Sequence, residues 1–195
     1  MVLRRWNTIF VSVLVTALFM RKLSMEELGR LSVPDFKSAP KTAVTLVLDN
    51  IRSLHNVGSA FRTADAFSLE QIILTGITGT PPHREIEKTA LGATQSVSWK
   101  YDESAENVVA ALKGSGYHIV VVEQTDQSIP LDLFSIPPGK RLALVFGNEI
   151  NGVSPEVLQH ADSAVEIPQS GTKHSINVSV CIGIVVWEVV RRFRA

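Results

Sequence analysis

Short runs of apolar, mostly β-branched residues alternate with segments of helical periodicity along this chain. Continuous apolar runs of four to six residues are typical of strands that are buried on both faces of a sheet. Because neighbouring parallel strands need a crossover, usually a helix, the alternation predicts an α/β fold with a mostly parallel sheet flanked by helices. Strands are expected at residues 43–48, 71–74, 97–101, 117–122, 142–146 and 164–167, and helices at 57–67, 85–91, 105–113, 154–160 and 177–194.

The first nineteen residues need a separate interpretation. Arg4 and Arg5 precede a short apolar run, as in a signal peptide, but no small-x-small cleavage site follows. The run is too short and too polar to span a membrane comfortably. We favour an over-extended reading frame, with the native start at Met20. A secreted or envelope-anchored protein is the alternative, and amino-terminal sequencing of the native protein would decide between them.

The segment after Met20 is expected to be a small extension of the main domain. Ser24 and Glu27 form a capping-box pattern, which predicts a short helix to about residue 31. A linker is predicted at residues 33–40. The expected domains are residues 1–19 as a signal-like or over-extended segment, 20–42 as a helical extension, and 43–195 as the main domain.

Composition narrows the class of protein. The 19 basic and 19 acidic residues balance, so no global charge attracts the chain to nucleic acid, and any such contact needs a local patch. The single cysteine, Cys181, excludes an internal disulfide and fits a reducing, cytoplasmic compartment, and its apolar neighbours favour an unreactive thiol. The five histidines are scattered, so no metal site is expected.

The loop that follows the predicted strand 142–146 is a candidate site. Ligands of open α/β sheets bind beyond the carboxyl ends of the strands, and Gly147 to Ser154 lies at such an end. It is not a phosphate loop, because Val153 stands where the essential lysine would be. On these residues alone, a plain turn that uses asparagine and glycine for positive φ remains an open alternative.

Two further segments have a similar character. In residues 49–66, Asn56 is a candidate N-cap, and Arg62 could either pair with Asp65 on the helix surface or bind phosphate. In residues 167–180, a polar loop leads into an apolar helix, and Ser175 is a candidate N-cap. For each of these residues, a structural and a functional role both remain possible when the segment is taken alone.

Together, the three segments resemble in order and spacing the three motifs of the SpoU/TrmH-like branch of the SPOUT methyltransferases. The resemblance covers about residues 20–194, and Ile176 stands where leucine or methionine is common. The matching residues are Asn56-x-Gly58 with Arg62 to Asp65, Phe146 to Glu149 with Gly152, and Ile167-Pro168 with Gly171 and Ser175 to Ser179.

The resemblance implies a parallel α/β fold with a deep C-terminal trefoil knot that holds S-adenosylmethionine. The knot would be formed by the second and third motif regions. Backbone groups and close-approaching glycines would read the adenine. The matching cofactor contacts are Val122, Glu123, Gln124, Gly147, Ile167 and Ile176.

The implied reaction is methyl transfer to a ribose 2′-hydroxyl in RNA. The family's arginine is matched by Arg62, which would help to deprotonate the hydroxyl together with an RNA phosphate. A free guanidinium is a poor base, with a pKa above about 12, so we favour positioning and phosphate binding for Arg62. The residues expected to hold the ribose, the loops and the arginine are Asn56, Glu149, Ser175 and Asn177.

The resemblance also implies a homodimer, formed through the knot and the C-terminal helix, with Arg62 reaching the partner's site. RNA would bind across the dimer cleft, and no membrane is expected. Candidate phosphate contacts are Arg52, His55, Arg84 and Lys173. We favour tRNA over rRNA, because only residues 20–42 extend the domain and because Glu123 to Thr125 with Ser128 is similar to members that act on guanosine. An rRNA substrate, methylation of a base, and RNA binding without catalysis are the alternatives.

Overall fold

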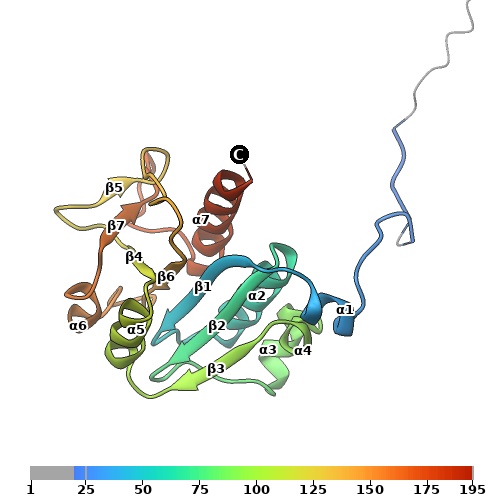
Figure 1. The fold of residues 1–195 in the computed structure, drawn as a ribbon. Coiled ribbons are helices and arrows are strands. Elements are labelled where there is room, and N and C mark those ends of the chain that lie inside the picture. The colour runs from blue at the N-terminus through green and yellow to red at the C-terminus, as the bar shows by residue number, and fades with distance from the viewer. Residues whose placement is uncertain (1–19, 25, 195) are drawn as a thin grey trace, which may run out of the picture. The chain divides into compact units, whose positions relative to one another are not determined.

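The computed structural model describes residues 20–24 and 26–194, so the expectations for residues 1–19 lie outside it (Figure 1). The chain divides into two units, residues 1–31 and 32–195, which are described separately. Among the residues described, no helix combines the length and the apolar character needed to cross a membrane.

The amino-terminal unit has the predicted capping box but not the predicted helix. The Ser24 N–H donates to the Glu27 carboxylate at 2.8 Å, and the Glu27 N–H donates to Ser24 Oγ at 3.2 Å. Residues 26–29 nevertheless form a turn, so the prediction of a helix to residue 31 is wrong. The reason is that the described residues of this segment are exposed, and a short helix without a packed apolar face is marginal in water.

A seven-stranded sheet forms the centre of the second unit (Figure 1). Its strands are β1 (Thr42–Asp49), β2 (Leu69–Thr75), β3 (Trp99–Asp102), β4 (His118–Val122), β5 (Ile129–Pro130), β6 (Leu142–Phe146) and β7 (Ser163–Glu166). They are ordered β3-β2-β1-β6-β4-β7-β5, and all six ladders are parallel. The predicted α/β class with a parallel sheet is therefore confirmed.

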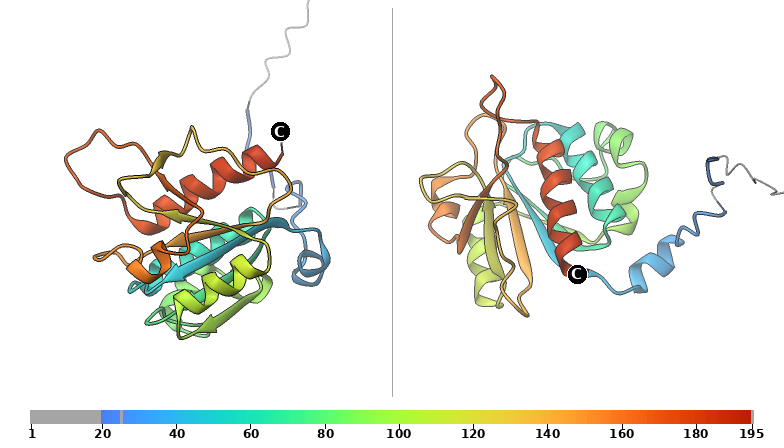
Figure 2. Two further views of the ribbon diagram at one scale, coloured as in Figure 1. Left: turned by 60° about the vertical axis from the view of Figure 1, so that its left-hand side comes forward. Right: turned by 90° about the horizontal axis from the view of Figure 1, so that it is seen from above.

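Helices cover both faces of this sheet (Figure 2). They are α1 (Val33–Ser38), α2 (Leu54–Ala66), α3 (Arg84–Ala90), α4 (Ala93–Ser96), α5 (Ala105–Gly114), α6 (Pro155–Leu158) and α7 (Val178–Phe193). Leu46 and Leu48 of β1 belong to the core shared with α2 and α7, whereas Val47 belongs to the core shared with α5 and α6. Successive side chains thus enter different cores, which explains why β1 is continuously apolar in sequence.

The segment predicted as a linker at residues 33–40 contains α1, so that prediction is wrong. Ser32 caps the helix by accepting a hydrogen bond from the Asp35 N–H, and Pro34 lies in the first turn, where a missing N–H costs nothing. Phe36 is buried in the core, and α1 packs against α4. One anchoring residue in a single turn leaves no periodicity in the sequence.

Helix α2 begins three residues earlier than predicted, at residue 54 rather than 57. Ser53 is the N-cap, because its hydroxyl accepts a hydrogen bond from the Asn56 N–H at 3.4 Å. The prediction that Asn56 is the N-cap is therefore wrong. Asn56 lies inside the first turn and is 9% exposed, so its side chain is free to make contacts with other parts of the chain.

Gly58 allows α2 and α3 to approach closely. A Cβ at this position would lie 2.2 Å from the Ile86 carbonyl oxygen and 2.2 Å from Thr89 Oγ1. We expect Gly58→Ala to lower the free energy of unfolding by about 1–3 kcal/mol, because backbone of α3 would have to move. Gly114→Ala, at the open end of α5, is the matched control and should change it by less than about 0.5 kcal/mol. Urea denaturation measures both, and equal effects would contradict this role for Gly58.

Candidate functional site

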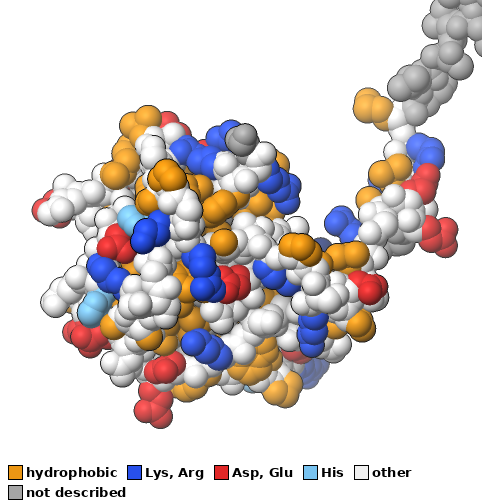
Figure 3. Space-filling view, in the orientation of Figure 1, with side chains coloured by type: hydrophobic (Ala, Val, Ile, Leu, Met, Phe, Trp, Pro, Cys, Tyr) orange, Lys and Arg blue, Asp and Glu red, His pale blue; other side chains and the backbone are white. Residues whose placement is uncertain are grey.

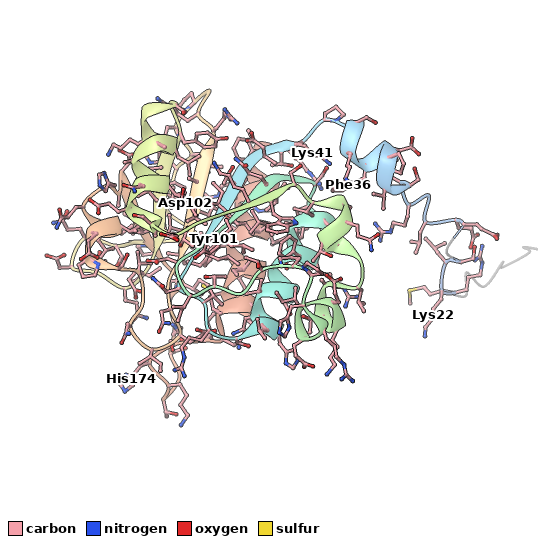
Figure 4. The ribbon with its side chains drawn as sticks, turned by 90° about the horizontal axis from the view of Figure 1, so that it is seen from below. Lys22, Phe36, Lys41, Tyr101, Asp102 and His174 are labelled. Carbon is pink, nitrogen blue, oxygen red and sulfur yellow. The ribbon has the colours of Figure 1, made fainter. Side chains whose placement is uncertain are left out.

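A cavity of about 440 Å³ opens beyond the carboxyl ends of β4, β6 and β7. This volume lies in the range of small-molecule sites, and its place in the sheet is where open parallel sheets bind ligands. Three segments line it: the end of β4, the loop after β6, and the chain between β7 and α7. His174, at its rim, projects away from the body of the domain (Figure 4).

The loop after β6 folds back on itself. Asn148 and Gly152 exchange two backbone hydrogen bonds of 2.9 Å each, and Gly152 has a φ of 69°. The Asn148 side chain accepts from two N–H groups of the same loop and donates to the Asn50 carbonyl oxygen at 2.7 Å. A Cβ on Gly147 would lie 2.1 Å from the Val153 nitrogen, so the two arms of the loop touch at this glycine.

The segment between β7 and α7 is open. Within the described part of the chain, no hydrogen bond joins residues 168–175 to any other residue, and all eight are exposed. Their backbone N–H and C=O groups are therefore available to a ligand or to another chain. The residues predicted to contact a cofactor all line the cavity: Val122, Glu123, Gln124, Gly147, Ile167 and Ile176.

A chain of side-chain hydrogen bonds joins the three motif segments. The Asn177 amide donates to Asn56 Oδ1 at 3.2 Å, and the Asn56 amide donates to Glu149 Oε1 at 2.9 Å. Asn177 also caps α7, because its Oδ1 accepts from the Ser179 N–H at 2.9 Å. Both amide orientations follow from these partners. The structure thus brings together three of the five residues predicted as catalytic.

Glu149 is held as a carboxylate. Its two oxygens accept hydrogen bonds from the Arg52 N–H at 2.9 Å and from the Ser53 N–H at 3.1 Å, besides the Asn56 amide. Partial burial opposes ionisation, but these hydrogen bonds outweigh it and lower the pKa of Glu149 below its ordinary value. A carboxylate with a lowered pKa is a weak base, so the geometry favours an anchoring role.

We expect the stabilising effect of the Glu149 carboxylate to depend on pH with a definite sign. The folded-state pKa lies below the unfolded value of about 4.3, so the effect is present above that pH and is lost as the pH falls through the folded-state pKa. The melting temperature of the unsubstituted protein should exceed that of Glu149→Gln by about 2–4 °C at pH 7. The difference should shrink below about pH 4. Thermal unfolding followed by circular dichroism tests this, and a pH-independent difference would contradict it.

Ser175 lines the cavity, is exposed, and lies two residues before Asn177, the N-cap of α7. The N-cap interpretation of Ser175 is wrong, because Asn177 caps the helix. Cys181 also lines the cavity, and burial, with the nearby charge of Glu123, raises the pKa of its thiol to about 11. Little thiolate exists at neutral pH, in agreement with an unreactive cysteine.

Arg62 lies outside this cavity. It is exposed on α2 and lines a separate groove of about 400 Å³, between α2 and α3, that also includes Lys88 and Phe67. Asp65 accepts a hydrogen bond from Ser96 Oγ, and no ion pair links Arg62 to Asp65 in the described structure. The surface-pair interpretation of Arg62 is therefore wrong.

The four predicted RNA contacts lie on three segments of the chain and are all exposed. Arg52 and His55 flank the start of α2, and His55 Nε2 lies 2.9 Å from the carboxylate of Glu85 on α3. Arg84 is exposed at the start of α3, and Lys173 is exposed on the open loop before α7. One face of the molecule shows basic side chains dispersed among acidic and apolar ones (Figure 3).

Sequence reasoning missed two residues that shape the site. Asp49 is 1% exposed and accepts a hydrogen bond from the Ser154 N–H at 2.9 Å. Asn50 has a φ of 58°, and its carbonyl oxygen receives the Asn148 amide. The available signal was that an aspartate and an asparagine directly follow the apolar run 43–48. Parallel strands end at the same edge of a sheet, so these residues could have been expected near the loop after the strand 142–146.

Comparisons with known proteins agree with this arrangement. The SpoU rRNA Methylase family matches residues 43–187. A tRNA (guanosine(18)-2'-O)-methyltransferase of Aquifex aeolicus is 33% identical over 150 residues, covering 74% of this chain and 67% of that protein. A 23S rRNA (guanosine-2'-O-)-methyltransferase RlmB of Neisseria meningitidis is 33% identical over 147 residues, covering 75% and 58%.

A solved structure is similar as well. The crystal structure of an AdoMet-bound rRNA methyltransferase from Sinorhizobium meliloti matches with a TM-score of 0.73 and 26% identity, over 80% of this chain and 58% of that one. The chain therefore spans between 58% and 67% of the length of the three proteins compared.

Proposed function

This chain belongs to the SpoU rRNA methylase family, and we propose that it methylates a ribose 2′-hydroxyl of a structured RNA with S-adenosylmethionine as the donor. The observation that carries the proposal is that three segments far apart in sequence meet at one cavity, and that Asn56 of α2 joins two of them by hydrogen bonds to Glu149 and from Asn177. Relatives named as tRNA and 23S rRNA 2′-O-methyltransferases support this reaction class.

The cavity fits S-adenosylmethionine. Its volume suits a nucleoside with a short side chain, and the unpaired backbone of residues 168–175 can read an adenine edge. When bound, this cofactor supplies an electrophilic methyl group on a sulfonium. The proposed contacts are Val122, Glu123, Gln124, Gly147, Ile167 and Ile176.

The chain's own residues must orient the ribose and help its hydroxyl to lose a proton. Glu149 is committed to three hydrogen bonds, and a guanidinium is a poor base. We therefore assign Arg62 to binding the RNA phosphate beside the reacting ribose. Asn56 and Glu149 hold the start of α7, where Asn177 and the exposed Ser175 hydroxyl face the ribose.

We propose a homodimer formed through the C-terminal helix. Val180, Ile184 and Trp187 are 52%, 40% and 54% exposed and recur at helical spacing, so α7 presents an apolar stripe. Arg62 lies outside the cavity of its own chain, as a residue that serves the partner's cavity would.

We also propose that the C-terminal part of the chain forms a trefoil knot. In its support, the chain leaves β7 near one edge of the sheet and returns to pack α7 against α2.

The proposed substrate is tRNA, with an rRNA as the second candidate. At the same identity, this chain spans 67% of the tRNA-modifying relative and 58% of the rRNA-modifying one. Contacts with RNA phosphates are proposed for Arg52, His55, Arg84 and Lys173, each of which carries or can carry a positive charge at the surface.

A methyl-transfer assay tests the proposal. Labelled S-adenosylmethionine is incubated with the protein and unmodified total tRNA, and rRNA is tested in parallel. Alkaline hydrolysis separates ribose from base methylation, because a 2′-O-methyl group leaves an alkali-resistant dinucleotide. Nuclease mapping of the product then names the nucleotide. We expect label in such dinucleotides from tRNA.

Other outcomes separate the alternatives. Label in rRNA alone would change the proposed substrate from tRNA to rRNA and would leave the proposed reaction unchanged. Label that alkali releases as mononucleotides would show a base methyltransferase. Binding of cofactor and RNA without any transfer would support an RNA-binding protein and would overturn the catalytic proposal.

A further inference from the structure

Two carboxylates hold the loop after β6 from both sides. The sheet places β6 between β1 and β4; β1 ends in an acidic residue, and β4 is followed directly by one. Asp49, at the end of β1, accepts a hydrogen bond from the Ser154 N–H at 2.9 Å. Glu123, directly after β4, accepts one from the Val153 N–H at 3.0 Å. Two successive backbone donors of one arm of the loop are thus bound by two carboxylates from opposite directions.

Both carboxylates are fixed by second hydrogen bonds. The other oxygen of Asp49 accepts from the Asn50 amide at 2.8 Å, and the other oxygen of Glu123 accepts from the Gln124 N–H at 2.9 Å. Hydrogen bonds from N–H groups to ionised carboxylates are stronger than those to neutral acceptors. The two side chains are therefore firm supports for the loop.

Gly152 completes the arrangement. Its φ of 69° suits glycine, and a Cβ there would lie 2.2 Å from Glu123 Oε2. The glycine thus gives the carboxylate access to the Val153 N–H. Because Gly147 touches Val153 across the loop, fixing residues 153 and 154 also fixes the arm that lines the cavity.

We infer that Asp49 and Glu123 are positioning residues that set the cofactor-binding wall of the cavity before the cofactor binds. This inference rests on the proposed function for the identity of the ligand. Asp49 does not line the cavity, so any effect of Asp49 on the ligand must pass through the loop. Glu123 does line it, so its loss could act through charge as well as through the loop.

The test compares Asp49→Asn and Glu123→Gln with the unsubstituted full-length protein. Isothermal titration calorimetry gives the Kd for S-adenosylmethionine, and hydrogen exchange gives the protection of the Val153 and Ser154 amides without ligand. We expect each variant to raise Kd by about tenfold and to speed exchange at these two amides, because a loop that samples other conformations binds in proportion to its competent fraction.

Two further variants separate positioning from general effects. Asp162→Asn removes a carboxylate that accepts a backbone N–H, that of Ile119 at 2.8 Å, at the opposite end of the sheet. It should lower the melting temperature without changing Kd. Glu166→Gln removes a charge from the cavity lining, but its carboxylate accepts from Ser128 Oγ rather than from the loop. It should raise Kd clearly less than Glu123→Gln.

Three results would overturn the inference. One is fast exchange of the Val153 and Ser154 amides in the unsubstituted protein. Another is an unchanged Kd in Glu123→Gln, which stays decisive if Asp49→Asn fails to fold. The third is an equal rise in Kd for Glu166→Gln and Glu123→Gln, which would assign the effect to charge. If the unsubstituted protein binds no S-adenosylmethionine, the proposed function fails, and the exchange measurement still decides whether the two carboxylates hold the loop.

Discussion

Arg62→Ala is expected to slow methyl transfer by about 10²- to 10⁴-fold while leaving cofactor affinity within about twofold. The two effects separate because Arg62 lies in the groove between α2 and α3 and does not line the cavity. Single-turnover rates at saturating RNA give the first quantity, and calorimetry with S-adenosylmethionine gives the second. A rate within tenfold of the unsubstituted protein would remove Arg62 from the proposed machinery.

Arg62→Lys is the matched substitution, because it keeps the positive charge and removes the planar fork. If Arg62 holds a phosphate with two parallel hydrogen bonds, lysine should restore only part of the rate, with a loss of about tenfold remaining. Full rescue by lysine would mean that charge alone is sufficient. Lys88→Ala, which removes the other cation of the same groove, shows whether the groove acts as a unit.

The position of Arg62 also makes the dimer proposal testable. If each site combines the cavity of one subunit with Arg62 of its partner, Arg62→Ala mixed with a cavity-deficient variant should form heterodimers that contain one intact site. Neither variant alone would be active. After random exchange of subunits, about a quarter of the unsubstituted rate should return. No recovery, with subunit exchange shown independently, would place Arg62 and the cavity in the same subunit.

The strands of the central sheet were predictable because burial on both faces leaves a continuous apolar run. The structure confirms this for β1, β4 and β6, whose predicted and observed bounds differ by one residue at most. The short elements were not predictable. β5 has two residues and exists through its pairing with β7, and α4 is one turn without a side-chain cap. Elements of this size depend on tertiary contacts, which local patterns do not encode.

The functional site was also predictable only in part. The polar loops after β1 and β6 could be identified because each directly follows an apolar run. The hydrogen bond between Asn56 and Asn177 joins residues 121 positions apart, and no local pattern specifies such an amide pair. The separation of Arg62 from Asn56 has a simple cause. Six residues of an α-helix turn it by about 600°, so the two side chains leave α2 about 120° apart.

Gly147→Ala is expected to weaken S-adenosylmethionine binding by about a hundredfold or more, equivalent to about 2.7 kcal/mol. A Cβ at this position would lie 2.1 Å from the Gly152 carbonyl carbon and 2.1 Å from the Val153 nitrogen. Both atoms are backbone, so a rotamer change cannot relieve the overlap. The two arms of the loop must separate, and the paired hydrogen bonds between Asn148 and Gly152 would be lost with them.

Gly114→Ala is the matched control for Gly147→Ala. Gly114 is the last residue of α5 and does not line the cavity, and a Cβ there would meet nothing within 4 Å. The affinity of this variant for S-adenosylmethionine should stay within about threefold, since the main effect is a smaller range of backbone conformations. Calorimetry on both variants, with circular dichroism to verify the sheet, tests the contrast. Equal affinities would mean that the arms of the β6 loop can part without affecting the cavity, and the cofactor would then have to bind elsewhere.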